Sequence, residues 1–193
     1  MNMEKKKKLL LHICCGPCAV YVVEKLKSDY EVTGYFYNPN IQPKKEYEFR
    51  EKELARVAHL KNWDVISEEH DMNNWFQRVK GYEKEPEKGR RCSICFYMRL
   101  EKAFMYAKTN GFDIVASTLS ISPYKVTKQI NAEGEKLAKI FDCEFLPANF
   151  KAQGGFDICR KMAHELEIKH QEYCGCVFSK VEKKLRALKP FSG

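Results

Sequence analysis

No stretch of this sequence approaches the roughly 20 consecutive apolar residues that a membrane-spanning helix requires. The basic segment 1–8 is followed by an apolar run that stops at Cys14, which is too short for a secretory signal. The composition fits neither collagen nor a coiled coil nor a disordered chain. These absences predict a folded protein of the cytoplasm that has no membrane partner.

The glycine motifs that cradle phosphates in ATP- and NAD-binding proteins are also absent, so neither nucleotide is expected. The length of 193 residues suits one domain over residues 1–193, with flexible ends at 1–7 and 189–193. Lysine and arginine number 34 against 26 for aspartate and glutamate, a net charge of +8. This excess favours an anionic partner, and the aromatic residues near many basic ones slightly favour RNA.

Helical and strand patterns alternate along the chain. Strands are expected at 8–13, 32–37, 63–67, 112–117 and 144–146, and helices at 19–28, 44–61, 72–79, 93–109, 125–141, 157–168 and 178–188. This alternation predicts an α/β fold, a mostly parallel sheet of about five strands with helices on both faces. Ligands of such sheets bind at the carboxyl ends of strands, here at Cys14 and at residues 117–122.

Nine cysteines are present, and seven of them fall into three groups. The groups are Cys14, Cys15 and Cys18 in a CCGPC segment, Cys92 and Cys95 in CxxC, and Cys174 and Cys176 in CxC. In a reducing compartment such pairs are typical of metal-binding or catalytic sites. The two remaining cysteines, at 143 and 159, are expected to be buried, small apolar residues.

The adjacent cysteines at 14 and 15 follow a strand, where neighbouring side chains point to opposite faces. This predicts that the pair serves two different centres. The CxxC is expected at the start of a helix, where the helix dipole and Arg90 with Arg91 favour the thiolate form.

Three chemistries compete for these cysteines. Thioredoxin-like thiol–disulfide exchange fits Cys15 and Cys18 but leaves the other five grouped cysteines unexplained. A zinc-stabilised RNA-binding module fits the CxxC and CxC pairs but not the first group. An iron–sulfur centre with a second metal accounts for all seven.

Other polar residues carry weaker signals. The segment 117–125, which includes Tyr124 and Lys125, places hydroxyl groups and a lysine before a helix, where phosphate or sugar could bind. An ordinary capped turn explains the same residues equally well. His12 precedes the first cysteine group by two residues and fits either a core histidine or a proton donor.

Five segments taken together resemble the cobalamin-independent epoxyqueuosine reductase family (QueH). They are HICCGPC at 12–18, RCSICFYMRL at 91–100, STLSISPYK at 117–125, FLPANFK at 145–151 and YCGCVFS at 173–179. The resemblance covers about residues 9–179. It implies a Rossmann-like fold related to ATP-pyrophosphatase-type tRNA-modifying enzymes, and the reduction of epoxyqueuosine to queuosine at the wobble position of tRNA.

The resemblance also implies a 4Fe-4S cluster beside a mononuclear iron, and no cobalamin. Cys92 and Cys95 would bind the cluster, one of Cys14/Cys15 and one of Cys174/Cys176 would complete it, and the remaining two would bind the iron. An aspartate that serves as a third iron ligand in at least one member falls at Cys18 here, so Cys18 is a candidate ligand.

Two electrons and two protons are needed to turn the epoxide into the alkene. The expected partners are therefore a one-electron donor such as ferredoxin or flavodoxin, and the anticodon stem-loop of tRNA. Lys125, Tyr124 and His12 are the candidate proton donors, with Cys18 beside them as a candidate catalytic residue.

Overall fold

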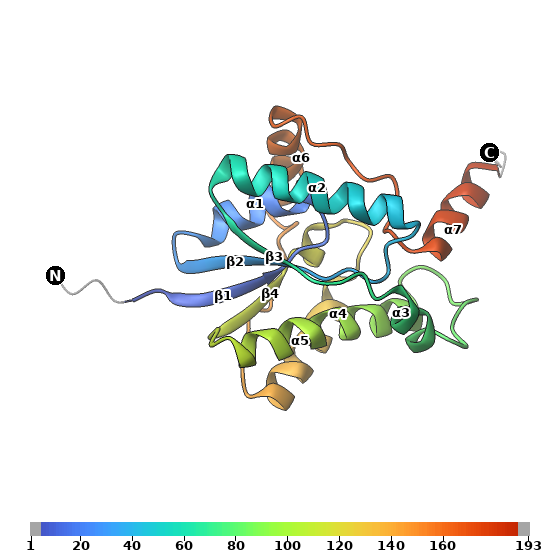
Figure 1. The fold of residues 1–193 in the computed structure, drawn as a ribbon. Helices are drawn as coiled ribbons and strands as arrows, with labels where there is room; N and C mark the ends of the chain where they lie inside the picture. Colours follow the sequence, from blue (N-terminus) through green and yellow to red (C-terminus); the bar gives the residue numbers. More distant parts are fainter. Residues whose placement is uncertain (1–4, 189–193) are drawn as a thin grey trace.

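A computed structural model describes residues 5–188 as a five-stranded sheet between two layers of helices (Figure 1). Its parallel strands are β1 (Lys7–His12), β2 (Tyr30–Phe36), β3 (Asp64–Ser67), β4 (Ile114–Ser117) and β5 (Glu144–Phe145), in the order β3-β2-β1-β4-β5. The predicted α/β class and parallel sheet are confirmed. β1 is central, and its residues Leu9, Leu10 and Leu11 are fully buried, as its uninterrupted apolar run predicts.

The helices divide between the two faces of the sheet (Figure 1). On one face lie α1 (Gly16–Leu26), α2 (Lys44–Lys61) and α6 (Gly155–Glu165), and on the other lie α3 (Met72–Arg78), α4 (Arg90–Thr109) and α5 (Thr127–Phe141). The last helix, α7 (Val177–Leu188), projects beyond one end of the sheet. Among the described residues, no helix is both long and apolar enough to cross a bilayer.

The order of the strands creates a crevice between β1 and β4. From β1 the chain proceeds to β2 and β3 on one side of the sheet, and it later returns to β4 and β5 on the other. Neighbouring loops therefore diverge beyond the carboxyl ends of β1 and β4, which is where open α/β sheets bind ligands. The segments from Ile13 and from Thr118 onward border this crevice.

Several boundaries differ from the predicted ones in ways that affect the site. β1 ends at His12 rather than at Cys14, and Cys14 lies in a bend. α4 begins at Arg90, so Cys92 belongs to its first turn. A 3₁₀ turn at Thr118–Ile121, where the Ser117 hydroxyl accepts from the Leu119 N–H, was not predicted. Of the ends expected to be flexible, Lys7 is part of β1, and residues 1–4 and 189–193 lie outside the described ones.

Candidate metal centre

The first cysteine group forms a compact cluster of sulfur atoms. The Sγ atoms of Cys14 and Cys15 are 3.6 Å apart, and those of Cys15 and Cys18 are 3.2 Å apart. All three lie within 4.8 Å of one another, the only such set of possible metal ligands among residues 5–188. Ligands of a four-iron cube bind different iron atoms, so their sulfurs lie further apart than the ligands of one ion. At least two of the three thiols can therefore hold one ion, and the third can hold it with them or bind an adjacent cluster.

The local backbone explains why these sulfurs meet. Cys15 is the N-cap of α1, and Pro17 occupies the first turn, where its missing N–H costs nothing. The Cys14 N–H donates to Thr118 Oγ1 at 3.3 Å, which ties the bend to the segment after β4. The prediction that Cys14 and Cys15 point to opposite faces is wrong, because strand alternation does not continue through the bend.

The CxC pair is held by a buried arginine. Arg50 on α2 donates to the carbonyl oxygens of Tyr173 and Cys174 at 3.1 and 3.3 Å, and it pairs with Glu46 at 2.7 Å. Gly175 has φ +120, and a Cβ at this position would lie 2.9 Å from Ile41 Cγ1. Only glycine fits such a turn.

Replacing Gly175 by alanine should therefore destabilise the protein by about 1–3 kcal/mol through backbone strain, with the clash adding to it. Gly111→Ala is the matched control: its φ is +69, and its Cβ would meet nothing within 4 Å. Urea unfolding of both variants checks this, and equal losses at the two positions would contradict the proposed clash.

Cys92 and Cys95 come from the first two turns of α4. Burial, together with the charge of Cys174 nearby, raises the pKa of Cys92 to about 11. Burial likewise raises the pKa of Cys95, with Cys174 again contributing in the same direction. The charge of the CxC group thus acts on both cysteines of the CxxC group.

Hydrogen bonds from neighbouring thiols, and nearby cationic side chains, favour the thiolate form at Cys14 and Cys174. Hydrogen bonds from Cys15 and Cys18 lower the pKa of Cys14, and a hydrogen bond from Cys176 lowers that of Cys174. Burial lowers the pKa of Lys125, but the charges of Cys174, Cys14 and Cys18 outweigh it and raise that pKa above its ordinary value. Lys125 therefore holds a positive charge between the first and last cysteine groups.

A cavity of about 420 Å³ opens at this end of the sheet. The residues that border it include Cys14, Cys15, Cys18, Cys159, Cys174, Tyr124 and Lys125. Cys92, Cys95 and Cys176 do not border it, so the seven grouped cysteines divide into four at the cavity wall and three away from it.

The remaining candidates take different places. His12 is fully buried, with Nδ1 2.9 Å from Ser117 Oγ and Nε2 3.2 Å from the Tyr37 carbonyl oxygen. Burial lowers its pKa to about 3, so it is a neutral core histidine with both nitrogens paired. Cys159 is buried as predicted and its thiol donates to the Pro17 carbonyl, whereas Cys143 is only partly buried.

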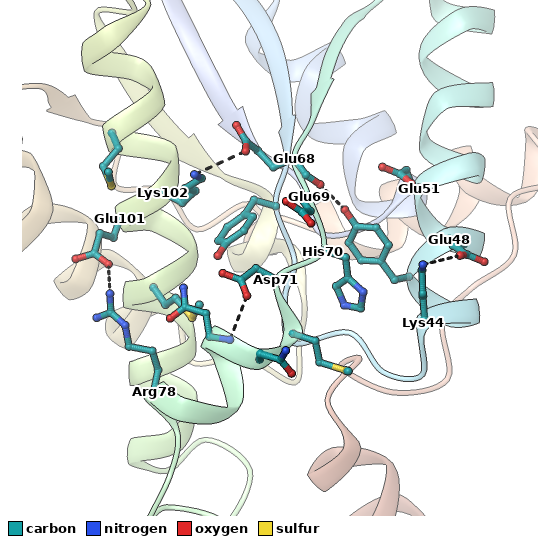
Figure 2. Close-up of a pocket in the computed structure, with 17 residues that line it drawn as sticks. Lys44, Glu48, Glu51, Glu68, Glu69, His70, Asp71, Arg78, Glu101 and Lys102 are labelled. Atoms are coloured by element: carbon teal, nitrogen blue, oxygen red, sulfur yellow. Dashed lines mark hydrogen bonds and ion pairs between the residues drawn. The ribbon is translucent and has the colours of Figure 1, made fainter.

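A larger cleft of about 990 Å³ lies beside the ends of β2 and β3 (Figure 2). Six carboxylates and three cations line it, and all three cations pair with carboxylates: Lys44 with Glu48, Arg78 with Glu101, and Lys102 with Glu68. This cleft repels anions, and no cysteine is among its lining residues in the described part of the chain. It is therefore a poor site for a nucleic acid or an iron–sulfur centre.

The structure also shows buried groups that the sequence reading missed. Arg50 and Arg99 are almost inaccessible, at 2% and 1% exposure. Both occur in helices whose sequences are rich in charged residues, and such sequences predict that an arginine faces solvent. For Arg99 a signal exists, because it follows Cys92 by seven residues and Cys95 by four and so shares their helix face.

Comparison with known proteins gives a consistent result. Residues 9–182 match the family described as "Epoxyqueuosine reductase QueH". Proteins of that name from Acinetobacter baylyi and Haemophilus influenzae are each 45% identical, covering 91% and 89% of this chain and 82% and 71% of their own lengths. The protein of that name from Thermotoga maritima is 31% identical and covers 91% of this chain and 92% of its own length.

Among solved structures, the fold resembles the U34-tRNA thiolase NcsA from Methanococcus maripaludis, whose structure contains a 4Fe-4S cluster. The TM-score is 0.55 over 96% of this chain and 69% of the thiolase, at 12% identity. This likeness confirms the expected α/β fold. By its sequence over nearly the whole length, the chain belongs to the epoxyqueuosine reductase QueH family.

Proposed function

We propose that this protein reduces epoxyqueuosine to queuosine at the wobble position of tRNA. The epoxide takes up two electrons and two protons, both C–O bonds break, an alkene forms, and the oxygen leaves as water. The observation that carries the proposal is the arrangement of the cysteines in a chain of this family: four of the seven line the cavity at the crevice between β1 and β4, and the other three pack in the same core cluster as Cys14 and Cys15.

The cysteines fit iron centres rather than a purely structural role. Soft thiolates are the ligands of iron–sulfur clusters and suit thiolate-bound iron. Cys92, Cys95 and Cys176, which do not border the cavity, would hold a 4Fe-4S cluster together with one of Cys14 and Cys15. Cys18, Cys174 and the other of Cys14 and Cys15 border the cavity and would hold a mononuclear iron.

When bound, the cluster would relay single electrons from a donor such as ferredoxin or flavodoxin, and the iron would polarise the epoxide oxygen, without cobalamin. The chain's own contribution is a shaped cavity with Lys125 in its wall. Lys125 Nζ keeps its proton beside the thiolates and can deliver it to the departing oxygen. We propose Lys125 rather than His12 as the proton donor, because His12 is neutral and enclosed.

The mouth of the cavity suits a base extruded from an RNA loop. Tyr124 lies at the rim with 68% of its surface exposed, and Phe156 and Tyr173 border the same cavity. Lys183 and Arg186 on α7 bring positive charge to this rim. Aromatic faces stack on bases and cations bind phosphates, so this rim can hold an anticodon loop with its wobble base turned inward.

If this rim binds tRNA, Lys183→Gln should weaken binding severalfold at moderate salt and reduce the slope of log K against log salt by about one. Its ion pair with the exposed Glu172, at 3.2 Å, leaves the charge available to RNA. The control is Lys139→Gln on α5, in a hollow that Lys7 and Asp113 also line at the opposite end of the strands. Filter binding over a salt series measures both slopes, and equal slopes would contradict this surface assignment.

Anaerobic purification tests the proposed function directly. The expected protein is brown, contains about five irons and four sulfides per chain, and converts epoxyqueuosine in tRNA to queuosine with a chemical or protein reductant and no added cobalamin. Colourless protein that contains only zinc, or iron-loaded protein without turnover on such tRNA, would overturn the proposal.

A further inference from the structure

Arg99 is a buried cation without an anionic partner. Its side chain is 1% exposed, and no carboxylate of residues 5–188 lies within 4.0 Å of it. Its single hydrogen bond runs from Nη2 to Asn38 Oδ1 at 2.5 Å, and its Nε–H has no partner among the described residues. Burying an unpaired guanidinium costs several kcal/mol, so the fold should place an anion beside it.

The surroundings of Arg99 indicate which anion this is. Arg99 follows Cys95 by one helical turn on α4, so the two side chains share a helix face. Asn38, which anchors Arg99, also donates to the Ile13 carbonyl at 2.9 Å, directly before Cys14. The positive charge of Arg99 favours the thiolate form at one cysteine of each group, Cys14, Cys95 and Cys174, although burial still leaves the pKa of Cys95 above its ordinary value.

Trp75 presents a second unsatisfied donor at the same place. Its indole is 1% exposed, and Nε1–H has no partner among the described residues. Trp75 packs in the same core cluster as Cys95, and its ring is 5.9 Å from that of Phe178, just after the CxC pair. Arg99 lies one helical turn from the same cysteine. Two buried N–H donors that lack a partner among the described residues therefore lie in the surroundings of Cys95.

We propose that Arg99 and Trp75 are positioning residues for the iron–sulfur cluster, with Arg99 as its buried counter-ion and both as N–H donors to the Cys95 sulfur. The cluster and its thiolate ligands together would supply the anionic partner that Arg99 lacks among the described residues. Hydrogen bonds to the ligating sulfurs and nearby positive charge stabilise the reduced cluster, which carries one more electron. Arg99 and Trp75 thus raise the reduction potential of the cluster, so that the electron donor can reduce it. This inference rests on the proposed function, since it presupposes the cluster.

The test is a redox titration of the anaerobically purified holoprotein, with the reduced cluster followed by electron paramagnetic resonance. Trp75→Phe keeps an aromatic ring but removes the donor, and should lower the reduced-to-oxidised ratio at fixed potential about tenfold, or about 59 mV for one electron. Arg99→Gln should lower that ratio by at least tenfold, and Arg99→Lys should recover part of it. Trp63→Phe, at the only other tryptophan, should leave the ratio unchanged.

Iron and sulfide counts separate the possible failures. Wild-type protein without a cluster would overturn both the proposed function and this inference. A wild-type protein that holds its cluster and turns over, while Trp75→Phe and Arg99→Gln keep the wild-type potential, would overturn this inference alone. If Arg99→Gln fails to load iron, Trp75→Phe decides by itself: an unchanged potential contradicts the proposal, and a lowered one supports it.

Discussion

Replacing Cys92 by alanine should remove all acid-labile sulfide and about four of the five irons expected per chain. Cys92 lies in the first turn of α4, partly buried, and its sulfur accepts the Lys88 N–H at 3.3 Å. A methyl group there leaves the cluster one thiolate short. Turnover should fall by about 10³-fold or more, which corresponds to about 4 kcal/mol in the barrier.

Two further variants make this expectation specific. Cys143→Ser changes a cysteine outside the three groups, whose thiol donates only to backbone oxygens among the described residues, and should keep wild-type metal content. Cys18→Ala should lose about one iron and retain the sulfide, because Cys18 borders the cavity where the single iron is proposed. Metal and sulfide analysis of anaerobic samples measures all three. Retained sulfide in Cys92→Ala would contradict the assignment of the CxxC to the cluster.

The sequence predicts the framework of this protein well because its signals are local. α2 runs from Lys44 to Lys61 as expected, since Pro43 precedes its first turn and Asn62 ends it with φ +54. β1 is recognisable from its uninterrupted apolar run, which is typical of a strand that is covered by helices on both faces. The parallel sheet follows from the alternation of such elements, and the crevice follows from the order of the strands.

The details of the site depend on contacts between distant segments, which spacing alone does not specify. Cys14 and Cys15 were expected to point apart, but a bend tied to Thr118 by a hydrogen bond between residues 104 positions apart turns both sulfurs to one side. The separation of Cys174 from Cys176 is likewise visible only in three dimensions, because one borders the cavity and the other does not. The burial of Arg99 likewise follows from the packing of α4 on β1, which the sequence alone does not specify.

Family resemblance supplied the chemistry that spacing left open. Considered alone, Cys15 and Cys18 fit thiol–disulfide exchange as well as metal binding, and their sulfurs are only 3.2 Å apart. The relatives at 31–45% identity place the whole constellation in a reductase family rather than in a disulfide exchange protein. The structure adds a physical reason: Cys14 and Cys174 border the same cavity as Cys15 and Cys18, and Cys92, Cys95 and Cys176 pack in the core cluster that contains Cys14 and Cys15.

Lys125→Met should reduce turnover by about 10²–10⁴-fold, the range that a positioned general acid contributes. Lys125 is the cationic group in the cavity wall whose charge the thiolates of Cys14, Cys18 and Cys174 stabilise. Methionine matches the length and apolar volume of the lysine stem but has no proton to give. Iron content and the affinity for tRNA should stay close to wild type, since the change leaves every sulfur ligand and the Lys183 side of the rim in place.

The comparison that isolates proton delivery is Lys128→Met, one helical turn further on and exposed on the first turn of α5. It removes the same charge from the same surface without reaching the cavity, so it should retain nearly full turnover. Single-turnover rates under saturating reductant separate the chemical step from tRNA binding and electron supply. If Lys125→Met and Lys128→Met react equally fast, the proton reaches the departing oxygen from solvent, and Lys125 serves only to balance the charge of the thiolates.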